Sequence, residues 1–200
     1  LYPVDPSSKG SCFIGGNIAH GSGGPRVVKY GTIREYVLNL EVVLPDGEII
    51  WTGANTLKYA SGYNLTQLMI GSEGTLGIIT KIVLKLISRP TQNLVMLASF
   101  PGNEQACEAV SAIFRARVTP STLEFMERKA VEWVIEYDHF QFDLKDEAQA
   151  FLMIEVDGND LDVLLTDCEK INEVLENNSC SDVLFADTAA QKEAIWRLRR

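Results

Sequence analysis

Residues 15–31 constrain the fold most, because six of the chain's 15 glycines fall within this short stretch. Each glycine in a regular element costs conformational entropy, so a dense run indicates unusual dihedral angles or close backbone approach to a ligand. We therefore expect neither an ordinary core helix nor a core strand here. A second glycine-rich run covers residues 71–80. Together the two runs predict a single cofactor site.

The chain has 200 residues, of which 46% are hydrophobic, enough for a substantial core in one or two domains. We expect two. The formal net charge of −9 argues against nonspecific binding to nucleic acid or to an anionic membrane. An anionic small substrate would need a local basic pocket.

The four cysteines form no C-x-x-C pair, and no spacing between them and the two histidines is typical of metal ligands. We expect reduced thiols in a cytoplasmic protein without a metal site. No signal peptide or spanning apolar run is present, although attachment at a membrane through a partner stays open. Because the chain starts at Leu1 instead of Met and stops within a predicted helix, we expect a fragment.

The first part of the chain predicts a small sheet. Alternating apolar residues indicate a strand over 38–44, a turn at residues 45–47 and a returning strand over 48–52. A short helix over 64–70 and a strand over 78–87 follow, with Ile82, Leu84 and Leu86 expected to point inward. Arg89-Pro90 marks the boundary between a domain of residues 1–90 and one of residues 91–200.

The second part repeats a β-α-β pattern. Strands are predicted over 93–100, 119–125, 151–156 and 183–186, and helices over 104–115, 128–137 and 161–175, with a last helix after Thr188. Two successive β-α-β units predict a ferredoxin-like antiparallel sheet with helices on one face. The fold class is therefore α+β.

Two common phosphate-binding motifs are absent. The spacing of Gly71, Gly74 and Gly77 differs from the dinucleotide fingerprint and precedes a strand pattern instead of a helix. No G-x-x-x-x-G-K-[ST] sequence occurs. What remains is a backbone surface, exposed by glycines, that suits hydrogen bonding to a flat heterocycle.

Several segments resemble, in order, the FAD-linked oxidases of the vanillyl-alcohol oxidase superfamily, which carry a PCMH-type FAD-binding domain. They are most similar to the branch that contains glycolate oxidase, D-lactate dehydrogenase and D-2-hydroxyglutarate dehydrogenase. The segments are residues 2–8, 14–19, 23–25, 29–31, 40–47, 62–67 and 71–80. Residues 91–200 resemble the family's substrate-covering (cap) domain more loosely.

The resemblance implies that residues 1–90 are the second of two subdomains that enclose FAD, and that the first subdomain is missing. It assigns one set of residues to the flavin ring and ribityl side: Pro3, Asp5, Ser11, Gly15, Gly16, Asn17 and Ala19. Another set lies toward the adenine end: Gly74, Gly77, Ile78 and Ile79. Glu73 would support that loop. His20 would reach the flavin, unless it is a structural histidine.

The terminal residues 195–200 resemble the family's Trp-x-x-Arg motif, in which the arginine grips the substrate carboxylate through a bidentate pair. That arginine would be Arg199, and the alternative is an exposed basic helix end. The family's metal-binding histidine pair and glutamate lie farther on and are missing.

The implied enzyme oxidises a D-2-hydroxy acid by hydride transfer to FAD. Its electrons would pass to a partner subunit, a quinone or an electron-transfer flavoprotein. The alternative is a non-catalytic module for ligand binding or assembly, with a degenerate flavin platform.

Overall fold

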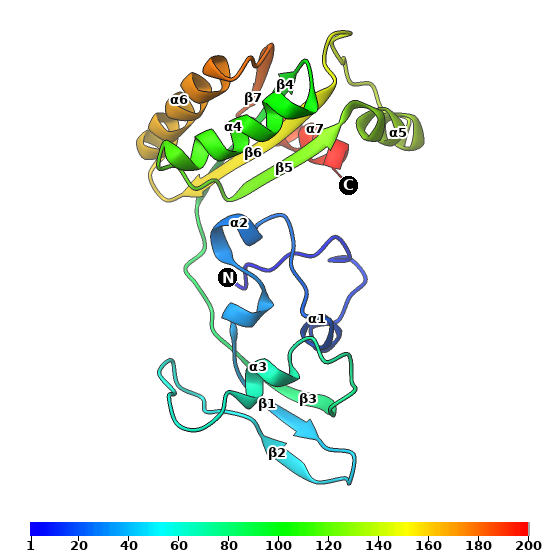
Figure 1. Ribbon diagram of the computed structural model, residues 1–200, viewed down its shortest axis with the longest axis vertical. Helices are drawn as coiled ribbons and strands as arrows, with labels where there is room; N and C mark the ends of the chain where they lie inside the picture. Colours follow the sequence, from blue (N-terminus) through cyan, green and yellow to red (C-terminus); the bar gives the residue numbers. More distant parts are fainter. Residues whose placement is uncertain (200) are drawn as a thin grey trace. The chain divides into compact units, whose positions relative to one another are not determined.

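The computed structural model describes residues 1–199, which form two compact units, residues 1–89 and residues 90–199 (Figure 1). The first unit contains a three-stranded antiparallel sheet with the strand order β2-β1-β3. Its elements are α1 (Ile14–His20), α2 (Val27–Tyr30), the 3-10 helix η1 (Ile33–Glu35), β1 (Val37–Val43), β2 (Ile49–Trp51), α3 (Leu65–Met69) and β3 (Ile78–Leu84).

The hairpin expected around residues 45–47 forms between β1 and β2. The Glu48 amide donates to the Asp46 carboxylate over 3.0 Å, and Gly47 takes the left-handed conformation that the turn needs, with φ at 89°. Inward residues of β1, such as Leu40, pack with Ile18 of α1 in the first unit's core. Leu86 differs from the prediction: it is 64% exposed, because β3 ends at Leu84 and the alternation ends with it.

The second unit contains a four-stranded antiparallel sheet with the strand order β5-β6-β4-β7. Both expected β-α-β units are present. The elements are β4 (Gln92–Phe100), α4 (Asn103–Arg115), β5 (Thr122–Glu127), α5 (Arg128–Asp138), β6 (Ala150–Gly158), α6 (Leu161–Asn177), β7 (Asp182–Ala186) and α7 (Ala189–Arg199).

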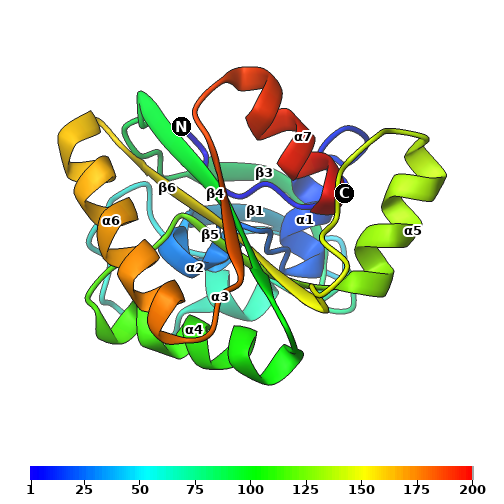
Figure 2. The same cartoon turned by 90° about the horizontal axis from the view of Figure 1, so that it is seen from above.

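The prediction of helices on one face of this sheet is wrong, because helices cover both faces (Figure 2). Helices α4 and α6 pack on one face, where Phe100 contributes to the core. Helices α5 and α7 pack on the other, where Val95 and Phe151 contribute. The central strands β4 and β6 are apolar at successive positions, so each strand needs cover on both sides.

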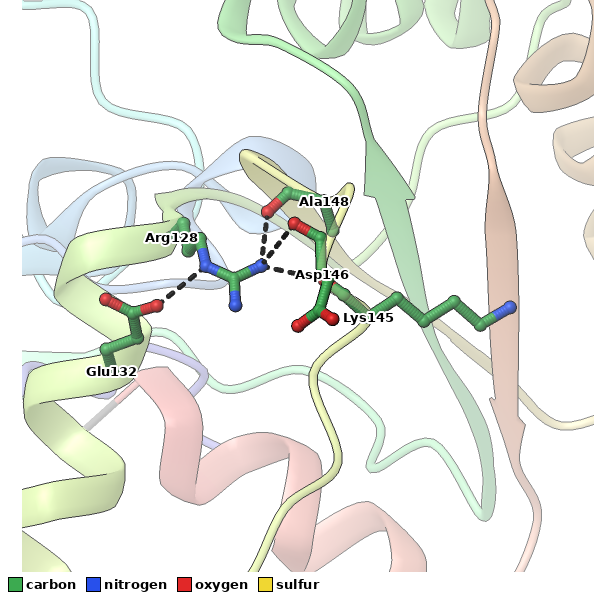
Figure 3. A network of polar contacts seen from close by, with 5 residues as sticks. All are labelled: Arg128, Glu132, Lys145, Asp146 and Ala148. Atoms are coloured by element: carbon green, nitrogen blue, oxygen red, sulfur yellow. Dashed lines mark hydrogen bonds and ion pairs between the residues drawn. The ribbon is translucent and has the colours of Figure 1, made fainter.

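Arg128 makes several hydrogen bonds to the segment between α5 and β6 (Figure 3). Nη1 of Arg128 donates to the carbonyl oxygens of Lys145, Asp146 and Ala148, at 2.7, 3.2 and 2.8 Å. Its Nε donates to Glu132 one turn along α5, at 2.6 Å. The first residue of α5 therefore ties the helix to the loop that leads into β6.

Candidate functional site

We expected no core helix in residues 15–31, and this prediction is wrong for the first residues of that range. Helix α1 includes Gly15 and Gly16, and within the run only Gly21 and Gly31 have a positive φ. Gly21 ends α1 in the left-handed conformation, and its amide donates to the Asn17 carbonyl over 2.9 Å. The helical cost of glycine, about 1 kcal/mol per residue, is offset here by complete burial of Ile18.

Packing within the chain does not explain Gly15 and Gly16. A Cβ atom added at either position would meet nothing within 4 Å, and neither residue has a positive φ. Gly24 is different, because a Cβ there would lie 2.5 Å from the Asp5 carbonyl oxygen. Phe13, just before α1, is 85% exposed. The start of α1 is thus an open surface on which both backbone and an aromatic ring are accessible.

The two glycine-rich runs meet at the end of α1. The amide of Gly71 donates to the Ile18 carbonyl over 3.0 Å, and the amide of Glu73 donates to the Ala19 carbonyl over 2.9 Å. His20 Nδ1 lies 3.0 Å from Glu73 Oε1, with both side chains largely exposed. Three of the predicted site residues therefore lie together.

The loop before β3 holds the residues predicted for the adenine end. Gly74 has a φ of 79°, so glycine suits this position for conformational reasons alone. Gly77 has a packing reason, because a Cβ there would lie 2.6 Å from Val42 Cγ1. Ile78 is exposed and Ile79 is half-buried at the start of the strand. The adenine-side role of these four residues stays a prediction.

A cavity of about 300 Å³ lies beside the N-terminal segment and α1. Three predicted residues line it, Pro3, Asp5 and Asn17, and so do Tyr2 and Cys12, which no sequence motif indicated as site residues. Ser11 lies in an exposed turn, where its hydroxyl donates to the Ser8 carbonyl.

Two lining side chains of this cavity have shifted pKa values. Within the described residues the buried Tyr2 hydroxyl has no hydrogen-bond partner, and burial raises the pKa of Tyr2 to about 12, with Cys12 adding to the shift. The Asn17 amide donates to Cys12 Sγ over 3.3 Å, and this bond lowers the pKa of the Cys12 thiol. The cavity thus combines an unsatisfied hydroxyl with a thiol whose pKa is lowered.

In the second unit, Arg199 lies in the last turn of α7 and is not a free basic side chain. Its Nε donates to Glu124 Oε2 of β5 over 2.8 Å. Three residues earlier, Trp196 Nε1 donates to Glu155 Oε2 of β6 over 3.1 Å. Local sequence patterns indicate neither carboxylate, because their partners are distant along the chain. Arg200, the last residue of the predicted motif, lies outside the described residues.

Within residues 1–199 no group of three or more His, Cys, Asp or Glu side chains is placed to hold a metal ion. All four cysteines are free: Cys12, Cys107, Cys168 and Cys180. No helix in this range is long and apolar enough to cross a bilayer.

Comparison with known protein families shows to which family the chain belongs. Residues 89–200 match the family described as FAD linked oxidases, C-terminal domain, and residues 1–53 match an FAD binding domain. The chain belongs to the FAD-linked oxidases. The predicted family, its cofactor FAD and the α+β fold class are confirmed.

Three relatives of this FAD-linked oxidase match all of its sequence. Glycolate oxidase subunit GlcD of Bacillus subtilis is 42% identical over 200 residues, and D-lactate dehydrogenase of Anaerostipes hadrus is 41% identical over 203. D-2-hydroxyglutarate dehydrogenase of Xanthomonas citri is 36% identical over 199. The chain spans 42% of the length of each.

Two solved structures of alkyldihydroxyacetonephosphate synthase share the fold. Their TM-scores are 0.73 and 0.74, at 22% and 24% identity. The matches cover 98% and 99% of this chain, and 37% and 40% of the synthase chains.

Proposed function

We propose that this chain is part of a longer FAD-dependent oxidoreductase that oxidises a D-2-hydroxy acid, such as glycolate or D-lactate, to the 2-oxo acid. The observation that carries the proposal is the match of the whole chain to relatives whose names specify glycolate, D-lactate and D-2-hydroxyglutarate as substrates. Each of those relatives is more than twice the length of this chain, so these 200 residues would supply only some of the active site.

Residues 1–90 would form the second FAD subdomain. The open start of α1, where Gly15 and Gly16 leave backbone uncovered, suits close approach by a flat ring system. The cavity lined by Pro3, Asp5 and Asn17 supports the same assignment. The Tyr2 hydroxyl, which also lines this cavity and has no partner within the described residues, would supply a hydrogen bond to the cofactor. Bound FAD would supply the hydride-accepting chemistry, while the protein fixes orientation and charge.

The loop that carries Glu73 would support the cofactor from the other glycine-rich run. Its backbone is tied to the end of α1 at Ala19, next to His20, so both runs present one continuous surface. Gly74, Gly77, Ile78 and Ile79 would continue this surface toward the adenine. The Ser11 hydroxyl already donates to the Ser8 carbonyl within an exposed turn, so it does not point to a flavin contact.

Residues 91–200 would form a ferredoxin-like substrate domain. Its connectivity β4-α4-β5-β6-α6-β7, with α5 inserted between β5 and β6, supports this assignment. Arg199 would bind the substrate carboxylate through its terminal nitrogens, because its Nε is already engaged by Glu124. The base that takes the hydroxyl proton would come from outside the chain.

The electrons would leave to a partner subunit, a quinone or an electron-transfer flavoprotein. The protein would work in the cytoplasm, either free or held at the membrane by that partner. The net charge of −9 supports attachment through a protein partner better than direct binding to anionic lipid.

The test uses the full-length protein, purified with FAD and assayed with the artificial acceptor dichlorophenolindophenol. We expect a flavin spectrum and dye reduction with at least one of glycolate, D-lactate and D-2-hydroxyglutarate, and little with L-lactate. A protein that stays colourless after reconstitution with FAD would contradict the proposal and favour the non-catalytic module. A coloured protein that oxidises no hydroxy acid would contradict the substrate class alone.

A further inference from the structure

The last turn of α7 carries two arginines whose carboxylate partners differ in setting. Arg197 pairs with Asp138 of α5 over 3.2 Å, and these side chains are 37% and 38% exposed. Arg199 pairs with Glu124 over 2.8 Å, and these side chains are 26% and 25% exposed. The Arg199–Glu124 pair is shorter and more sheltered, so solvent screens it less. Arg197 also donates to the Asp138 carbonyl and lies over the ring of Phe140, whereas within residues 1–199 Arg199 is held through Nε alone.

Glu124 lies on strand β5, which is held in place by its pairing with β6. Glu124 lies opposite Met153 of β6, in an unbroken antiparallel register. Its side chain shares the face of Met126, two residues on, which packs in the core with Ile195 and Leu198 of α7. The carboxylate therefore stands on the sheet face that α7 covers, and its position does not depend on a loop.

Helix α7 is itself fixed one turn before Arg199. Trp196 donates to Glu155, a carboxylate on β6 that is completely buried. The other oxygen of Glu155 accepts from Asn93 of β4 over 3.3 Å, and Lys192 of α7 donates to the Asn93 carbonyl over 2.6 Å. Helix, buried carboxylate and central strands thus form one polar network that sets the orientation of α7.

This arrangement leaves a specific part of Arg199 for a ligand. A guanidinium group has five N–H donors in a fixed plane, and the bond to Glu124 uses the one on Nε. Neither terminal nitrogen donates a hydrogen bond to any group within residues 1–199. Those nitrogens form the edge that can bind a carboxylate through two parallel bonds.

We propose that Glu124 is a positioning residue: it holds Arg199 by Nε so that the terminal nitrogens face the substrate carboxylate. The proposal rests on the function proposed above. A restrained guanidinium loses less freedom when the substrate binds, so the effect falls on substrate capture and not on hydride transfer.

Charge alone predicts the opposite sign. Removing a carboxylate beside Arg199 leaves a stronger positive potential for an anionic substrate, which would lower KM. Positioning predicts that the same removal raises KM, because the guanidinium is released. The direction of the change therefore separates the two roles.

The experiment compares Glu124→Ala, Glu124→Gln and Asp138→Ala in the full-length protein, with kcat, KM, the flavin spectrum and Tm as readouts. We expect Glu124→Ala to raise KM about five- to tenfold with kcat and the flavin spectrum unchanged. Glutamine keeps an oxygen that can accept the Nε bond, so Glu124→Gln should recover most of the loss. Asp138→Ala, which removes the side-chain partner of Arg197 as Glu124→Ala removes that of Arg199, should leave KM unchanged.

An unchanged or lower KM in Glu124→Ala would overturn the positioning role. If Glu124→Ala does not fold, Glu124→Asp replaces it, because its carboxylate is one methylene too short. The same rise in KM is then expected, and an unchanged KM overturns the proposal.

Arg199→Ala distinguishes failure of the proposed role of Arg199 from failure of the proposed role of Glu124. If it leaves KM and kcat intact, the proposed role of Arg199 fails. If Arg199→Ala loses turnover while Glu124→Ala changes nothing, only the role of Glu124 fails.

Discussion

His20 and Glu73 are 53 residues apart in the sequence, and His20 Nδ1 lies 3.0 Å from Glu73 Oε1. The backbone beneath them is joined as well, since the Glu73 amide donates to the carbonyl of Ala19. The side chains are 72% and 66% exposed, so solvent screens their attraction. The junction between the two glycine-rich runs therefore depends on main-chain hydrogen bonds, and the contact between the two side chains is secondary.

Glu73→Gln should accordingly change the free energy of unfolding by less than about 1 kcal/mol, as is typical of exposed ion pairs. Urea unfolding of the full-length protein measures this, with Asp182→Asn, which removes the carboxylate partner of Lys145 in another exposed pair, as a surface control. FAD should be retained in both variants. A loss of several kcal/mol in Glu73→Gln alone would show that the side chains hold the junction.

Gly16→Ala should separate stability from cofactor binding. A helical Gly→Ala change at an open position stabilises a protein by about 0.4–1 kcal/mol, and the new methyl group at this position meets nothing within 4 Å. If FAD approaches the start of α1, the same methyl group should weaken flavin retention. The measurements are urea unfolding and the ratio of flavin to protein absorbance after gel filtration.

Gly24→Ala is the control for the unfolding measurement. Its Cβ would lie 2.5 Å from the Asp5 carbonyl oxygen, so the backbone must shift and stability should fall by about 1–3 kcal/mol. A Gly16→Ala protein that is more stable and keeps FAD as tightly as the wild type would remove α1 from the flavin site.

Arg199→Lys should weaken substrate capture and leave the flavin spectrum unchanged. Lysine keeps the charge but lacks the planar fork, so it cannot hold Glu124 by Nε and present two parallel donors to a carboxylate. Loss of one charge-assisted hydrogen bond, about 1.5–3 kcal/mol, corresponds to a rise in KM of about ten- to a hundredfold. An unaltered KM would count against Arg199 as the carboxylate-binding residue.

Trp196→Phe should destabilise the second unit by about 1–3 kcal/mol, because the buried Glu155 carboxylate loses a donor. Thermal unfolding monitored by far-ultraviolet circular dichroism measures the change. Trp133→Phe is a suitable control, since that indole is 62% exposed on α5. Equal effects of the two substitutions would indicate that the bond to Glu155 contributes nothing measurable.

Alkylation should distinguish Cys12 from Cys168. The bond from Asn17 lowers the pKa of Cys12, whereas burial raises the pKa of Cys168 to about 11. The reactive thiolate therefore forms at lower pH on Cys12. Iodoacetamide at pH 8, followed by peptide mass spectrometry, should label Cys12 well before Cys168.

Repeating the alkylation after reconstitution with FAD tests the cavity beside α1, which Cys12 lines. Protection of Cys12 by FAD is expected. Labelling of Cys168 ahead of Cys12 would contradict the pKa order, and unchanged Cys12 labelling with FAD would place the flavin elsewhere.

The sequence predicted most elements of both units, because their apolar periodicity is local. Prediction failed where the structure depends on packing against both faces of a sheet, or on contacts between residues far apart in the sequence. The successive apolar residues of β4, such as Val95 and Met96, are the signal for cover on both faces, which the β-α-β pattern alone does not carry. Glu124 could not be found, because the bond that matters joins residues 75 positions apart. The helix through Gly15 was missed because burial of Ile18 outweighs glycine's poor propensity.

The contact of Arg128 with the loop before β6 has an evolutionary consequence. Its Nη1 binds the carbonyl oxygens of Lys145, Asp146 and Ala148, which every amino acid at those positions would provide. A change of side chain at Lys145 or Asp146 would therefore leave these hydrogen bonds in place, whereas Ala148 is also constrained by its complete burial. Arg128 itself has no such freedom, since one substitution there would release all three contacts. These three hydrogen bonds thus constrain the identity of Arg128, and not the identities of the residues whose carbonyl groups accept them.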